Sequence, residues 1–149
     1  MSDFKLNCNI SPITNKGVRV SFKQKRTYHT PEYETYCQHL MMRIRRNLSH
    51  DWKPLEGPLL LQVAFYLRRP KSVKRKFHET KPDLDNLLKP LLDCLQKMNV
   101  FKNDSQIFSI HAVKFYEGER IDKNGPGIDL TLNKIESDSS FIDREITSG

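Results

Sequence analysis

The chain has 149 residues and a formal net charge of +7, with 37% hydrophobic and 29% charged residues. This composition is typical of one soluble globular domain, and the positive charge favours an anionic partner without identifying it. No apolar run approaches the roughly 20 residues that cross a membrane, and residues 1–5 lack the apolar core of a signal peptide. Three cysteines without paired spacing exclude a disulfide framework and a zinc site, and they predict reduced thiols in a cytoplasmic protein.

Two short strands and a helix are expected at the start of the chain. Residues 4–10 and 18–22 alternate apolar and polar side chains with period two, which is typical of strands with one wet face. A basic turn is expected at residues 23–26. Thr30 as N-cap and Pro31 at the first helical position then predict a helix that runs to about residue 48. We expect this helix to bury one apolar stripe, made of Tyr33, Tyr36, Leu40, Ile44 and Leu48.

A hydrophobic strand is followed by a strongly basic loop. Residues 59–67 are almost continuously apolar, which predicts a central strand buried on both faces. Residues 68–78, the basic loop, hold no acid. They are open to two interpretations: a mobile, solvated segment of like charges, or a surface that lets a polyanion lie across an acidic site. Phe77 likewise has two interpretations: a residue that stacks on a nucleic-acid base, or an aromatic that anchors the loop to the core. The candidate DNA-binding residues are the six cations Arg68, Arg69, Lys71, Lys74, Arg75 and Lys76.

An amphipathic helix with acids at its start follows Pro82. Its apolar stripe has spacing i, i+3, i+4, i+7, i+8 and i+11, in the order Leu84, Leu87, Leu88, Leu91, Leu92 and Leu95. Asp83 and Asp85 can serve as a cap and a complement to the helix dipole. They can also reach one Mg²⁺ together, if Asp83 is still extended and Asp85 lies in the first turn.

The C-terminal part predicts two more strands. Residues 105–116 are dense in strand-forming side chains, with Asp104 at the mouth of the strand. Residues 118–127 are expected to form a wide hairpin loop, and residues 128–135 alternate cleanly as its return strand. We expect an ordered domain over 1–136 and a disordered tail over 137–149. The elements predict a single α+β domain, ββαβ-αββ, with a mixed β-sheet and two main helices on one side.

Two runs of the chain resemble a known family signature. Residues 81–95 and 100–107 contain a basic start, Asp-Leu-Asp-Asn-Leu, a lysine soon after, a leucine-rich helix, and a later Asp before a small residue and Gln-Ile. This order resembles the RusA family of crossover junction endodeoxyribonucleases, found in bacteria and their phages. Family members often carry two acids in a row before the small residue. In this chain the first of the two positions is Asn103.

The resemblance implies that Asp83, Asp85 and Asp104 hold a catalytic Mg²⁺ and that Lys89 assists at the phosphate. It also implies a bacterial or phage-encoded homodimer that acts on branched DNA, resolving four-way (Holliday) junctions by paired symmetric nicks in recombination and repair. Neither a membrane nor a nucleotide cofactor is expected. From the residues alone, Lys89 can equally form an ordinary ion pair with Asp85 or Asp93. Two other functions stay open: a non-catalytic nucleic-acid-binding module that uses the basic loop alone, and a branched-DNA nuclease with little four-way preference.

Overall fold

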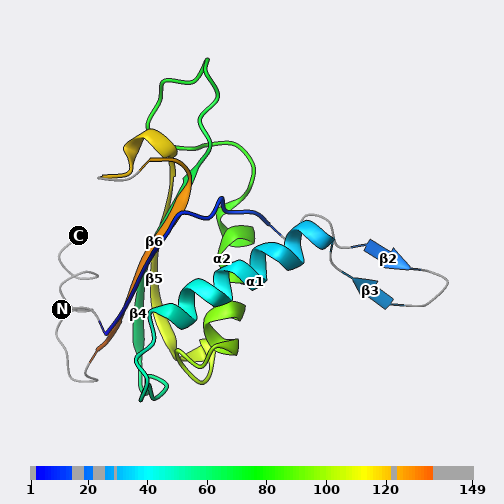
Figure 1. The fold of residues 1–149 in the computed structure, drawn as a ribbon. Coiled ribbons are helices and arrows are strands. Elements are labelled where there is room, and N and C mark those ends of the chain that lie inside the picture. Colours follow the sequence, from blue (N-terminus) through cyan, green and yellow to red (C-terminus); the bar gives the residue numbers. More distant parts are fainter. Residues whose placement is uncertain (1–2, 15–18, 22–25, 29, 122–123, 136–149) are drawn as a thin grey trace.

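The computed structural model describes residues 3–14, 19–21, 26–28, 30–121 and 124–135 (Figure 1). They form one four-stranded sheet, one two-stranded sheet and two α-helices. In chain order the elements are β1 (Phe4–Cys8), β2 (Arg19–Ser21), β3 (Arg26–Tyr28), α1 (Pro31–Arg46), β4 (Leu59–Leu67), α2 (Leu84–Lys97), η1 (Asp104–Gln106), β5 (Ile107–Tyr116), η2 (Glu117–Glu119) and β6 (Gly127–Lys134).

The four-stranded sheet is mixed and has the order β1-β6-β4-β5. β4 and β5 are parallel because α2 carries the chain back between them, whereas β6 is antiparallel to both β4 and β1. The expected hairpin between β5 and β6 is therefore wrong, since β4 lies between these strands. The crossover through α2 places β5 at one edge of the sheet, next to β4. β6 pairs with the other side of β4.

Both helices cover the same face of the sheet, and α1 crosses α2 there (Figure 1). α1 begins at the predicted N-cap: Thr30 Oγ1 accepts a hydrogen bond from the backbone N–H of Tyr33 at 3.3 Å. The predicted stripe of α1 is buried except for Leu48, which lies beyond the helix and is half-buried. In α2, Leu87, Leu91 and Leu95 are fully buried. The predicted α+β class, with a mixed sheet and two helices, is confirmed.

Among the described residues, no helix lies on the other face of the sheet (Figure 1). Along β4, the residues that point toward the helices are buried, whereas Gln62 is exposed and Ala64 and Tyr66 are only half-buried. The prediction of burial on both faces is wrong. An apolar run does not reveal that both helices lie on one side, because Ala64 and Tyr66 suit a half-covered face as well as a covered one.

Two short strands form a hairpin apart from the main sheet, with Arg19 opposite Tyr28. β2 falls inside the predicted strand 18–22, whereas β3 begins at Arg26, where a turn was expected. Lys23 and Lys25 lie outside the described residues, as does the predicted tail 137–149. Within the described part of the chain, no helix has both the length and the apolar character needed to cross a bilayer.

Candidate active site

Asp83 and Asp85 stand at the first turn of α2. Asp83 occupies the N-cap position with extended backbone, φ −72° and ψ 148°, but its side chain makes no capping hydrogen bond. One carboxylate oxygen of Asp85 accepts the backbone N–H of Asn86 at 3.0 Å. Both side chains are exposed. The backbone geometry required for a shared cation is therefore present, and Asp83 is not engaged as a cap.

A cleft of about 580 Å³ opens beside Asp83. Its acidic wall is the start of α2, and the opposite wall is the segment that follows β1. The lining residues are Pro12, Ile13, Thr14, Lys81, Pro82, Asp83, Asn86, Lys89 and Pro90. The site thus combines one carboxylate, one amide and two ammonium groups. Such a mixture suits a phosphodiester and a cation held together.

Lys89 lies in this cleft, six residues after Asp83. Its ammonium is 3.8 Å from a carboxylate oxygen of Asp93, and the Lys89 side chain is 77% exposed. An i,i+4 pair of this length and exposure contributes only some tenths of a kcal/mol. The predicted alternative, an ion pair with Asp93, is therefore present but too weak to keep Lys89 from a phosphate.

Asp104 is held at the start of η1 by two glutamines. Its backbone N–H donates to Oε1 of Gln96 at 2.9 Å. Gln106 accepts from the N–H groups of Lys102 and Asn103 at 3.1 and 3.0 Å, and it donates to the carbonyls of Leu55 and Gly57 at 2.9 and 3.1 Å. These bonds fix the backbone of the segment while the Asp104 side chain stays exposed.

Asn103, which departs from the family pattern, has a capping role. Its side chain accepts the backbone N–H of Ser105 at 2.9 Å and caps η1. An acid here could accept the same hydrogen bond but would place a second charge beside Asp104. Asp104 is the acid that this segment offers to a cation.

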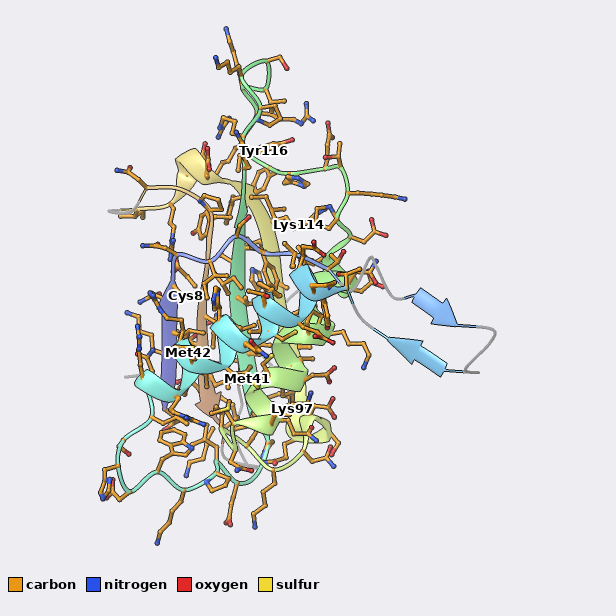
Figure 2. The ribbon with its side chains drawn as sticks, turned by 45° about the vertical axis from the view of Figure 1, so that its right-hand side comes forward. Cys8, Met41, Met42, Lys97, Lys114 and Tyr116 are labelled. Carbon is orange, nitrogen blue, oxygen red and sulfur yellow. The ribbon has the colours of Figure 1, made fainter. Side chains whose placement is uncertain are left out.

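Asp104 and the Asp83/Asp85 pair lie toward opposite ends of α2. Gln96, which binds the Asp104 backbone, follows Asp85 by eleven residues, a helical rise of about 16 Å. Lys97 and Lys114 mark these two ends in Figure 2. Ligands of one Mg²⁺ each lie about 2.1 Å from the ion. Accordingly, the described residues hold no group of three acids, histidines or cysteines close enough to share a metal.

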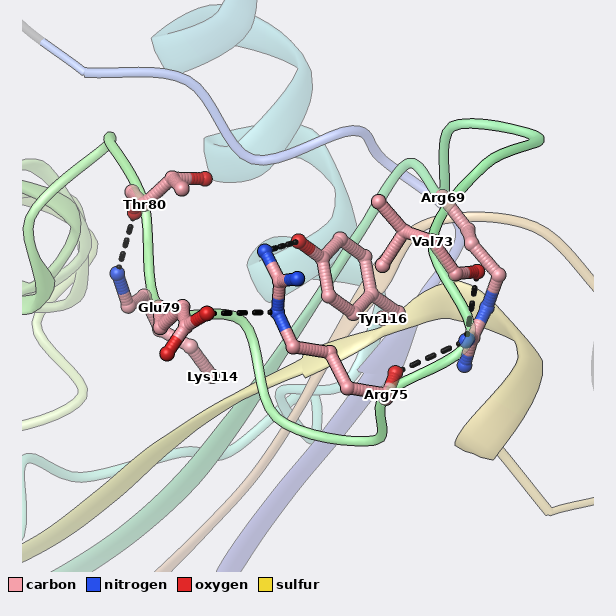
Figure 3. Close-up of polar contacts among 7 residues, drawn as sticks. All are labelled: Arg69, Val73, Arg75, Glu79, Thr80, Lys114 and Tyr116. Atoms are coloured by element: carbon pink, nitrogen blue, oxygen red, sulfur yellow. Dashed lines mark hydrogen bonds and ion pairs between the residues drawn. The ribbon is translucent and has the colours of Figure 1, made fainter.

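The basic loop wraps around the buried ring of Tyr116 (Figure 3). The guanidinium carbons of Arg69 and Arg75 lie 5.1 and 5.8 Å from the ring centroid. Arg69 also donates to the carbonyls of Val73 and Arg75 at 3.4 and 2.9 Å, and Arg75 pairs with Glu79 at 3.0 Å. The loop is therefore anchored, and the interpretation as a merely mobile, solvated segment does not describe it.

These contacts divide the six predicted DNA-binding cations into two groups. Arg69 is directed inward and its side chain is 22% exposed, with an ion pair to Glu119 at 3.3 Å. Arg75 is engaged with Glu79 but half-exposed. The cations left open to an approaching polyanion are Arg68, Lys71, Lys74 and Lys76.

Lys114 connects the edge strand to the acidic site. From β5 its ammonium donates to the carbonyls of Thr80 and Pro82, both at 2.8 Å. Pro82 immediately precedes Asp83, so Lys114 fixes the backbone that aims this carboxylate. Sequence reasoning missed Lys114 because only the parallel pairing of β4 and β5 brings it to Pro82. Asn86 could have been found, since its i+3 spacing from Asp83 places both on one side of a helix.

The chain matches one family model and several known proteins. A family model described as "Endodeoxyribonuclease RusA" matches residues 9–122. A protein of Aquifex aeolicus named crossover junction endodeoxyribonuclease RusA is 39% identical over 137 residues, covering 92% of this chain and 96% of its own. A protein of Lactococcus phage r1t with the same name is 36% identical over 132 residues, covering 87% and 96%. An uncharacterized Bacillus subtilis protein, YqaN, is 35% identical over 95 residues, 56% of this chain and 62% of its own.

Proposed function

Because the chain belongs to the RusA family of endodeoxyribonucleases, we propose that it resolves four-way DNA junctions by paired symmetric nicks, with Mg²⁺ as cofactor. The observation that carries the proposal is the environment of Asp83. Its carboxylate is free of the capping role and faces a cleft that also holds Lys81 and Lys89. The family match favours an enzyme over a non-catalytic binding module.

The Asp83/Asp85 pair fits Mg²⁺. This ion prefers oxygen ligands and is commonly held by one or two carboxylates, with water and substrate phosphate completing the shell. Asp83, whose side chain makes no capping bond, and the exposed Asp85 provide two such carboxylates. Both stand at the positive end of a helix that is packed on the core. The ion would supply charge neutralisation at the phosphoryl oxygens and a bound water of lowered pKa.

The cationic side chains of the cleft act on the phosphate itself. Lys89 and Lys81 would hold the scissile phosphate, and Lys89 would neutralise the charge that develops on it during hydrolysis. The open cations of the basic loop would bind neighbouring phosphates and offset the repulsion between DNA and the acids. Lys114 would keep Asp83 aimed into the cleft through the carbonyl of Pro82.

A homodimer explains why Asp104 is presented so far from the pair. Paired nicks require two equivalent sites, and a two-fold dimer presents each surface twice with opposed directions. In such a dimer the exposed Asp104 of one copy can approach the Asp83/Asp85 pair of the other. We therefore propose that each Mg²⁺ site is completed by both copies, since one chain does not bring the three acids together.

Mixed dimers test whether the site is shared. Asp83→Asn and Asp104→Asn proteins should each be inactive, whereas co-refolded mixtures should nick one strand of a junction, because one composite site in each mixed dimer keeps all its acids. Failure of the mixture to cut would mean that each site lies within one copy. Sedimentation should also give about twice the 17.5 kDa chain mass.

Cleavage of a labelled four-way junction tests the function directly. With Mg²⁺ we expect nicks at symmetric positions on two opposed strands, and with chelator no nicks. Linear duplex of the same sequence should stay intact. Equal cutting of three-way, four-way and flapped DNA would instead support a branched-DNA nuclease with little four-way preference.

A further inference from the structure

Three aromatic rings form a row on the face of the sheet opposite α1 and α2, at the end where the basic loop meets it. Tyr66 of β4 and Phe115 of β5 stack with centroids 5.5 Å apart and planes at 20°. Phe115 in turn stacks on Phe77 of the basic loop, with centroids 5.4 Å apart and planes at 27°. Phe77 ends the row and is 58% exposed. The row therefore terminates in a flat apolar surface open to solvent.

The backbone holds Phe77 in place independently of its ring. Phe77 forms an antiparallel bridge with Phe115. On either side, the N–H of His78 donates to the carbonyl of Lys114 at 3.1 Å, and the N–H of Tyr116 donates to the carbonyl of Lys76 at 3.2 Å. The loop is thus fastened by main-chain bonds and by its arginines. An aromatic needed only to tack the loop down would be buried, and this one is not.

Positive charge lies beside the exposed end of the row. The ammonium of Lys76 lies 5.6 Å from the ring centroid of Phe77 and 5.8 Å from that of Phe115. Lys71 and Lys74 are exposed in the same loop, and the acid that follows Phe77, Glu79, is paired with Arg75. A flat ring beside open ammonium groups complements a base with its attached phosphate.

We infer that Phe77 is a stacking site for a nucleobase whose face is exposed at the branch point of DNA, separate from the cleft of Asp83. The inference rests on the proposed function and adds to it a basis for choosing branched substrates. In paired duplex the base faces are covered by their neighbours, so a stacking site engages bases at a branch and not within a linear helix.

The position of the row strengthens this preference. Successive residues of a strand point to opposite faces, so Phe115 lies on the open face while Lys114 reaches toward Asp83 on the helix side. DNA that contacts both Phe77 and the cleft must pass around the β5 edge. Short linear duplex is stiff and resists such a turn, whereas arms that diverge from a branch point satisfy it without bending.

A junction that carries 2-aminopurine at the branch point tests the inference, in chelator so that no strand is cut. The fluorescence of this base falls when it stacks on an aromatic ring. Wild-type protein should quench it, Phe77→Trp should retain quenching, and Phe77→Ala should lose it. We expect Phe77→Ala to raise the junction Kd about 5- to 150-fold, with linear-duplex affinity and the salt dependence unchanged. Phe108→Ala removes another exposed aromatic, from the opposite end of β5, and should leave all of these values unchanged.

Several results would overturn the inference. An equal loss of affinity for junction and duplex would make Phe77 a general loop anchor, and a change in oligomeric mass would make the row a contact between copies. Thermal unfolding of Phe77→Leu, which keeps the apolar contact but not the stacking face, should match wild type. If wild type cuts junctions in Mg²⁺ and Phe77→Ala binds junctions as tightly as wild type, the stacking site is wrong and the proposed function is retained. If wild type does not bind junctions, both the stacking site and the proposed function are wrong.

Discussion

The start of α2 and the basic loop are both charged, and their charged side chains differ in whether they make contacts within the protein. At the start of α2, Asp83 makes no capping bond and remains exposed. In the loop, Arg69 binds two carbonyls, one carboxylate and the face of Tyr116. The acids at the start of α2 are exposed to solvent, whereas some cations of the basic loop make the contacts that hold the loop in place. A charge therefore indicates function here only when its contacts are known.

The largest effect is expected at the open acid. Asp83→Asn removes the carboxylate that we propose as a metal ligand, and no capping bond is lost with it, so cleavage in Mg²⁺ should fall by on the order of a hundredfold or more while junction binding is retained. Single-turnover cleavage and a binding titration in chelator measure the two quantities. Asp93→Asn is the matched control, because Asp93 lies on the same helix and only its long pair with Lys89 is lost. A fall in thermal stability of Asp83→Ala, which has no side-chain acceptor, would instead assign Asp83 a capping role.

The next largest effect is expected at Lys114, which binds the segment between the basic loop and α2. Lys114→Met leaves the carbonyls of Thr80 and Pro82 without their donor, which should lower the free energy of unfolding by about 1–2 kcal/mol. Asp83 would then be less well aimed, so cleavage should fall about tenfold, and more Mg²⁺ should be required for half-maximal rate. Lys102→Met, which removes only an exposed ion pair at 3.9 Å, should change neither quantity. An unchanged Mg²⁺ requirement in Lys114→Met would restrict Lys114 to a structural role.

A smaller effect should separate the two groups of cations within the loop. Arg69→Gln should cost about 1 kcal/mol of stability because its carbonyl and carboxylate bonds are lost. Lys71→Gln and Lys74→Gln should leave stability unchanged, and each should lower the slope of log K against log[salt] by about 0.9. Thermal unfolding and binding at several salt concentrations distinguish the groups. Equal salt slopes for all three variants and wild type would mean that DNA does not contact the loop.

The smallest effect concerns the pH dependence of the loop anchor. Burial, and then repulsion from Lys114 and Arg75, lowers the pKa of His78 below its ordinary value of about 6.5. Below that pH the unfolded chain takes up a proton more readily than the folded one, so stability should decline as the pH falls from 6.5 toward the folded-state pKa. His78→Phe should reduce this decline, as measured by unfolding at pH 5 to 8, whereas exposed His50→Gln should not. Identical pH profiles for His78→Phe and wild type would contradict this role.

Local patterns were sufficient to predict most of the elements. The leucine spacing of α2, the Thr30-Pro31 helix start and the period-two strands each depend on neighbours a few residues apart, and all were confirmed. The position of β6 between β1 and β4 was not foreseen, because clean alternation in a strand does not reveal its partner. One-sided burial of β4 was missed because its nearly continuous apolar run suits a half-covered face as well as a covered one.

The residues of the candidate site stay a prediction, and the structure shows where they lie relative to one another. The family resemblance named Asp83, Asp85 and Asp104, and the extended backbone at Asp83 agrees with the geometry expected for a cation. The separation of Asp104 depends on where η1 meets the end of α2, which requires the bond between Gln96 and Asp104. The inward direction of Arg69 depends on its contact with Tyr116, forty-seven residues away in the chain. No local sequence pattern predicts this contact.

The insertion of β6 into the middle of the sheet also sets the order in which the protein can fold. β1 has one partner strand in the main sheet, and Phe4 lies opposite Leu132 almost the full length of the domain away. During synthesis β1 must therefore wait, unpaired, until the end of the domain has left the ribosome, while β4, α2 and β5 can already associate. Contacts between such distant residues slow folding. The first strand to be made is thus among the last to be secured.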